Sequence, residues 1–111
     1  MREGFYRLQY ETATLNSTGV VTLQDGVITG CDRFYFMFGK YRQNNNRLEG
    51  TVTFKRHTER PGQSNAIPKQ FDIRFEGVCS EDYGQFEVSC PAVPLIKGRA
   101  RFTWLSSAQN D

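Results

Sequence analysis

The sequence predicts one all-β domain over residues 1–111, an eight-stranded antiparallel barrel with up-and-down strand order. Apolar and polar residues alternate with period two in successive short segments, and turn-forming residues separate these segments about every ten residues. No segment longer than one turn repeats apolar residues at helical spacing. A chain of 111 residues can bury one core. Mostly short connections favour closure, because a closed barrel leaves no exposed sheet edge.

The first half of the chain is predicted to contain five strands. Asp25-Gly26 readily supplies the two positive φ angles of a type I′ hairpin turn, so one strand should end before it and another begin after it. The run Asn44-Asn45-Asn46 tolerates left-handed conformations and should close the fourth strand. The five segments are roughly 4–13, a strand that carries Val21 and Leu23, then 27–30, 33–42 and 48–55.

Three further strands are expected after a long loop. Residues 57–69 are polar and interrupted by proline and glycine, so they should form the longest loop. Residues 81–84 should turn one strand into the next, and two prolines mark the connection to the last strand. At most a short helical turn is expected, in 91–97 or 64–68. The inward positions are Phe71, Ile73 and Phe75, then Phe86, Val88 and Cys90, and, within 97–105, Ala100, Phe102 and Trp104.

The inward positions are rich in aromatic rings, which leaves two outcomes open. The rings could line a cavity for an apolar guest such as an acyl chain, oriented by the hydroxyls of Tyr6 or Tyr10. They could equally fill the barrel, and a mostly packed interior is favoured because each aromatic side chain buries roughly 150–250 Å². The candidate cavity residues are Tyr6, Tyr10, Phe54, Phe71, Phe75, Phe86, Phe102 and Trp104.

The segment 33–42 departs from simple alternation, because both of its faces are apolar. One face can line the barrel, and the other then forms an aromatic patch outside it. Monomers seldom leave such patches in water, and a two-fold contact lets a patch cover its own copy, so a homodimer is predicted. The alternative is that the 57–69 loop or the chain ends cover the patch. The candidate interface residues are Phe34, Phe36 and Phe38 on one side and Tyr35, Met37 and Tyr41 on the other.

Charge and hydropathy favour a cytoplasmic protein that binds neither nucleic acid nor membrane. Fourteen Lys and Arg residues against twelve Asp and Glu residues give a formal net charge of +2, which produces no strong field. Arg99 and Arg101 could belong to a platform for single-stranded nucleic acid, which is the alternative function, but interspersed glutamates dilute the basic stripe. No stretch approaches the roughly 18 apolar residues of a membrane-spanning helix, and no apolar leader opens the chain.

No catalytic residue, metal site or cofactor is expected. His57 is the only histidine, and the sequence places no nucleophile or carboxylate partner beside it. The three cysteines, Cys31, Cys79 and Cys90, lack metal-ligand spacing. The residues therefore favour binding over catalysis, with either a protein partner or a small apolar molecule as the ligand.

Short motifs in the first half of the chain are similar to those of a known family. They are Gly4-Phe5-Tyr6, Thr18-Gly19-Val20-Val21, Asp25-Gly26, Gly30-Cys31-Asp32, Tyr35 and Gly39-Lys40-Tyr41. In this order, over residues 4–57, they resemble the N-terminal half of the GrlR-like family of Gram-negative bacteria. The resemblance implies a lipocalin-like barrel, a homodimer and a regulatory role. The family includes a negative regulator of type III secretion genes that binds a transcriptional activator rather than DNA.

Two features of the chain depart from the family pattern. Cys31 stands where the family has a second glycine. The secretion regulator holds its partner with a surface run of acidic residues, and this chain contains no comparable run. The nearest acidic segment is Ser80-Glu81-Asp82, with Glu76 shortly before it, so Glu81 and Asp82 are the candidate partner-binding residues.

Overall fold

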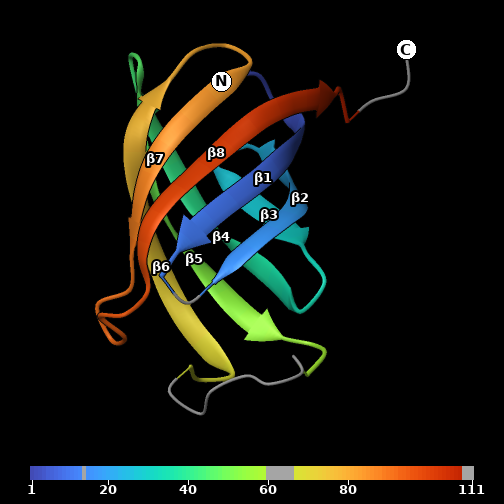
Figure 1. The fold of residues 1–111 in the computed structure, drawn as a ribbon. Coiled ribbons are helices and arrows are strands. Elements are labelled where there is room, and N and C mark those ends of the chain that lie inside the picture. The colour runs from blue at the N-terminus through green and yellow to red at the C-terminus, as the bar shows by residue number, and fades with distance from the viewer. Residues whose placement is uncertain (14, 60–66, 109–111) are drawn as a thin grey trace.

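The structure, a computed structural model that describes residues 1–13, 15–59 and 67–108, is a closed barrel of antiparallel strands (Figure 1). The strands are β1 (Gly4–Thr12), β2 (Asn16–Gln24), β3 (Val27–Cys31), β4 (Tyr35–Asn44), β5 (Arg47–Arg56), β6 (Gln70–Cys79), β7 (Tyr83–Ser89) and β8 (Lys97–Ser106). Each strand pairs with the next along the chain, and β8 pairs with β1 to close the barrel. The predicted fold class is therefore confirmed. The described ranges contain no helix that could span a membrane.

Two of the turns use the residues that the sequence singled out. Asp25 and Gly26 have φ angles of 52° and 77°, and they join β2 to β3 as a two-residue hairpin turn. Asn45 has a φ of 57° in the turn between β4 and β5. Asn44 still pairs with Arg47, so β4 runs up to this turn rather than ending at residue 42.

The start of β4 differs from the prediction for a local reason. The strand begins at Tyr35 rather than at residue 33. Asp32 Oδ1 accepts the backbone N–H groups of Phe34 at 2.9 Å and Tyr35 at 2.8 Å. A side-chain acceptor two and three residues upstream folds the chain into a turn, so pairing with β5 starts only afterwards.

No helical turn forms where the sequence allowed one between β7 and β8. The N–H of Val93 donates to the carbonyl of Cys90 at 3.1 Å, and the N–H of Ile96 donates to that of Val93 at 2.9 Å. These bonds close two successive turns instead of a helical segment. The other segment, 64–68, lies mostly outside the described residues.

Aromatic side chains fill the barrel in two groups. The ring centroid of Phe102 lies 4.8 Å from that of Phe86 and 5.9 Å from that of Phe75. In the second group Phe54 stacks on Phe71 with their centroids 5.4 Å apart. The space left among the interior residues is about 40 Å³. Because ligand pockets commonly measure roughly 300–1,000 Å³, the interior is occupied chiefly by the protein's own side chains.

Replacing Phe102 with Ala should lower the free energy of unfolding by about 3–5 kcal/mol, since its ring is buried and the change leaves a cavity. Urea denaturation measures this loss. Leu105→Ala is the matched control, because Leu105 lies on the same strand with 49% of its surface exposed. That change should cost less than about 1 kcal/mol. Equal losses for the two variants would contradict a filled interior.

Candidate functional site

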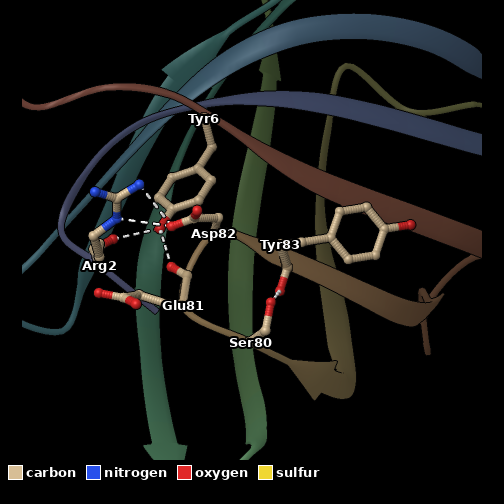
Figure 2. A network of polar contacts seen from close by, with 6 residues as sticks. All are labelled: Arg2, Tyr6, Ser80, Glu81, Asp82 and Tyr83. Atoms are coloured by element: carbon tan, nitrogen blue, oxygen red, sulfur yellow. Dashed lines mark hydrogen bonds and ion pairs between the residues drawn. The ribbon is translucent and has the colours of Figure 1, made fainter.

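The loop between β6 and β7 carries Glu81 and Asp82, and it lies beside the N-terminal segment (Figure 2). The N–H of Ser80 donates to the carbonyl of Tyr83 at 2.8 Å and closes the loop. The N–H of Trp104 on β8 donates to the carbonyl of Asp82 at 2.9 Å. The backbone of this loop is therefore fixed both internally and against the barrel wall.

Arg2 binds the Asp82 side chain and covers Trp104. Its Nε lies 2.8 Å and its Nη2 lies 2.7 Å from Asp82 Oδ1, and both nitrogens carry N–H donors (Figure 2). Its Cζ lies 3.9 Å from the centroid of the Trp104 ring, which is a cation–π distance. One of the two candidate partner-binding carboxylates is thus already engaged within the chain.

Glu81 contributes its backbone rather than its side chain to this network. Its carbonyl accepts the backbone N–H of Arg2 at 2.9 Å. Its exposed carboxylate has no hydrogen-bond or ion-pair partner in the part of the chain that the structure describes. The loop therefore keeps one unpaired negative charge beside an ion pair.

Tyr6 lies at this network and is fully buried. Its hydroxyl is 2.5 Å from the carbonyl oxygen of Arg2 and 3.2 Å from that of Glu81, so the O–H proton donates between them (Figure 2). Its ring meets Trp104 edge to face at 5.4 Å. Burial raises the pKa of Tyr6 to about 12, while the positive charge of Arg2 opposes this rise.

Gly4 makes room for the Trp104 ring. Its φ is 153°, a conformation that favours glycine. A β-carbon at this position would lie 2.8 Å from the Trp104 ring and 2.5 Å from the carbonyl oxygen of Ser106. The position of the indole beneath Arg2 therefore depends on the absence of a side chain at residue 4.

The N-terminal segment also contacts a second loop. Glu3 Oε2 accepts the backbone N–H of Asp25, in the β2–β3 turn, at 2.5 Å. The partly buried side chain of Met1 packs against the core. Residues 1–3 therefore link the β2–β3 turn to the β6–β7 loop.

A second polar network surrounds Asp32, in the β3–β4 turn. The Tyr10 hydroxyl donates to Asp32 Oδ2, and burial together with this bond raises the pKa of Tyr10. His57 Nε2 is 3.0 Å from the backbone carbonyl oxygen of Asp32, and its Nδ1 is 2.7 Å from the Thr58 hydroxyl. The His57 imidazole thus contacts a carbonyl and a hydroxyl. The Asp32 carboxylate instead accepts the backbone N–H groups that form the β3–β4 turn.

The structure divides the candidate dimer residues of β4 between the two sides of the barrel wall. Tyr35 and Met37 are buried inside, with exposed fractions of 0% and 2%, so they belong to the core and not to an outer interface. Phe36 and Phe38 point outward and are 41% and 40% exposed. Phe34 and Tyr41 are partly buried against the core.

Phe36 and Phe38 are part of a larger apolar face on the outside of β1–β4. Their rings stack with centroids 6.2 Å apart. Phe36 pairs across the sheet with the exposed Cys31, which pairs with Val20. Phe5 lies on the same outer side and reaches Phe38 through a row of two threonines. We call Phe5, Val20, Cys31, Phe36 and Phe38 the apolar face; the sequence did not assign the first three to it because their proximity depends on strand register.

A charged face covers the outside of the other half of the barrel. Glu49, Glu76 and Glu87 lie directly opposite one another on β5, β6 and β7. Arg42 and Arg99 flank this row, and Arg42 is 2.6 Å from Glu49. Like charges opposite one another are unfavourable in a sheet, and the Arg42–Glu49 ion pair and the pairing of Arg99 with Glu87 offset part of this repulsion. These five residues, the charged face, line an open groove of about 1,290 Å³.

The charged face also bears on the nucleic-acid alternative. Arg99 lies between Glu87 on one neighbouring strand and Glu11 on the other. A phosphate that approached Arg99 would therefore meet two carboxylates. The register thus opposes the basic stripe that the sequence left open.

Comparison with known proteins adds no assignment. No family model matches the chain, and no curated protein matches it. Three features of the structure bear on function: the network around Arg2 and Asp82, the apolar face and the charged face.

The stability of the protein should fall as the pH rises from about 10 to about 12. The pKa of Tyr6 is raised from 10.0 to about 12 in the folded state, so the unfolded chain loses this proton first. The contribution of Tyr6 to stability is complete below its unfolded pKa of 10.0 and is lost as the pH rises toward its folded pKa of about 12.

Urea denaturation of the wild type and of Tyr6→Phe at several alkaline pH values measures this effect. The variant should show a weaker dependence on pH in that window. Tyr83→Phe, which removes an outward-facing hydroxyl, should retain the wild-type dependence. An unchanged dependence in Tyr6→Phe would show that Tyr6 does not supply it.

Proposed function

We propose that this protein is a non-enzymatic regulatory binding protein of the cytoplasm that acts on a protein partner and works as a homodimer. The observation that carries the proposal is a filled barrel with two outer faces of opposite character. Only about 40 Å³ is free inside, whereas the groove on the charged face measures about 1,290 Å³. An open outer groove suits a macromolecule better than a small apolar guest.

The apolar face supports the homodimer. Phe36 and Phe38 each leave about two-fifths of their surface exposed, and Val20 is 43% exposed beside them. Several large apolar groups that adjoin on one surface usually mark an interface. Two copies related by a two-fold axis would cover both patches at once, because the same residues meet in each copy.

The charged face supports a separate protein partner. Its glutamate row places like charges opposite one another, and Glu76 in the middle of the row has no ion-pair partner among the described residues, so a basic side chain of another protein would reduce the repulsion. The resemblance to the GrlR-like family suggests a transcriptional regulator as that partner and the control of type III secretion as the process. In this proposal the partner-binding carboxylates are assembled across strands instead of along a run of sequence, and basic residues flank them.

The double variant Phe36→Ser and Phe38→Ser should be monomeric where the wild type is dimeric, because it removes the centre of the apolar face. Light scattering on a sizing column measures the mass. Val78→Ser is the control, since Val78 is 49% exposed on β6 and lies outside the apolar face. A monomeric wild type at micromolar concentration would refute the dimer.

The partner should depend on the glutamate row. Affinity capture from the source cell, followed by mass spectrometry of proteins and extracted small molecules, should recover a protein with the wild type. Recovery should fall at least tenfold with the double variant Glu76→Gln and Glu87→Gln, but not with Asp25→Asn, a change in an exposed turn. Equal recovery of the partner with the wild type, the double variant and Asp25→Asn would contradict the proposed role of the charged face. Recovery of an apolar molecule instead of a protein would contradict it as well.

A further inference from the structure

Arg2 occupies a cradle with the features that proteins use to recognise a guanidinium group. Asp82 Oδ1 lies 2.8 Å from Nε and 2.7 Å from Nη2 of Arg2. The centroid of the Trp104 ring lies 3.9 Å from Cζ of the same guanidinium group. A planar guanidinium donates in a fork and stacks on an aromatic face, whereas an ammonium does neither as well. The cradle is therefore suited to arginine rather than to lysine.

The walls of the cradle are held by bonds that do not involve Arg2. Trp104 and Asp82 are joined through their backbones at 2.9 Å, and the loop is closed between Ser80 and Tyr83. The Tyr6 hydroxyl has the Glu81 carbonyl as a second acceptor, at 3.2 Å. These bonds fix the backbones of Asp82 and Trp104 whether or not the Arg2 side chain is present, so the two residues would stay adjacent if that side chain left.

Arg2 itself is held loosely enough to be exchanged. Its side chain is 42% exposed and that of Asp82 is 57% exposed. Ion pairs with this degree of exposure contribute little, because water and salt screen them. The Arg2 side chain can therefore be displaced from the cradle by a group that approaches from the solvent.

We infer that the cradle of Asp82 and Trp104 is a binding site for an arginine side chain of a protein partner, and that Arg2 is an internal competitor for it. The inference rests on the proposed function only in naming a protein as the source of the arginine. The unpaired carboxylate of Glu81 adds negative charge at the cradle, and Figure 2 shows its side chain extending toward the side where Arg2 lies. A partner arginine with a second basic residue beside it would neutralise both carboxylates.

Competition by Arg2 has a measurable consequence. A ligand that binds only the open form shows an affinity reduced by the fraction of molecules that are open. Removing the Arg2 side chain should therefore strengthen binding of an added guanidinium compound while the backbone bonds of the site are retained. Trp104 reports on occupancy, since it is the only tryptophan in the chain.

The experiment titrates the full chain with an acetylated and amidated tri-arginine peptide while Trp104 fluorescence is recorded. Arg2→Ala should show a saturable change with an affinity roughly two- to sixfold higher than that of the wild type, since an exposed ion pair closes the cradle by only about 0.2–1 kcal/mol. A tri-lysine peptide should bind Arg2→Ala at least tenfold more weakly than tri-arginine does. Adding Asp82→Asn to Arg2→Ala should abolish the saturable change.

Two further variants keep the result interpretable. Arg7→Ala removes an exposed arginine of β1 and should behave as the wild type does. Arg2→Gln is a longer replacement that also lacks the cation; it should show the same gain in tri-arginine affinity that is expected of Arg2→Ala, so it keeps the test decisive even if the alanine variant unfolds. Tri-arginine affinity that is equal in the wild type and in both Arg2 variants would overturn the inference, and so would equal affinity for tri-lysine.

The outcome separates this inference from the proposed function. Tri-arginine binding does not depend on a captured partner, so failed capture alone leaves the cradle supported. A rise in molecular mass on removal of Arg2 would identify a second copy of the chain as the source of the arginine. That result would overturn the assignment to a separate partner.

Discussion

The pairing of β1 with β8 is the constraint on which the other features of the molecule depend. Figure 1 shows β1 lying between β2 and β8, so no strand is left with an unpaired edge. Closure fixes which side of every strand is inside, and it thereby selects Tyr35 and Met37 for the core and leaves Phe36 and Phe38 outside. It also places Trp104 next to Tyr6 and within reach of Arg2.

The sequence allowed most of the strands to be predicted, because the period-two pattern and the turn residues are local signals. Asp25-Gly26 is an example, since the positive φ angles that it adopts belong to the dipeptide itself. The start of β4 was placed too early because a side chain decided it. The Asp32 carboxylate accepts two backbone N–H groups, and the apolar pattern of the sequence gives no sign of these hydrogen bonds.

The candidate site was less accessible to sequence analysis, because it depends on register and on contacts between distant segments. Asp82 was selected as an acidic loop residue, yet its partner Arg2 is separated from it by 80 positions in the sequence. Glu49, Glu76 and Glu87 look unrelated in the sequence and become neighbours only through two strand pairings. The apolar nature of both sides of β4 was visible, but the side that faces outward was fixed only by closure.

The two outer faces lie on different halves of a closed ring, the apolar one on β1–β4 and the charged one centred on β5–β7. If two chains join through the first half, the grooves of their charged faces point away from each other. Such an assembly is bivalent, and it can hold two ligand molecules that never touch. For a target that is itself a pair, or that is repeated along a filament, the second contact forms at a high effective concentration, so modest grooves suffice for tight retention.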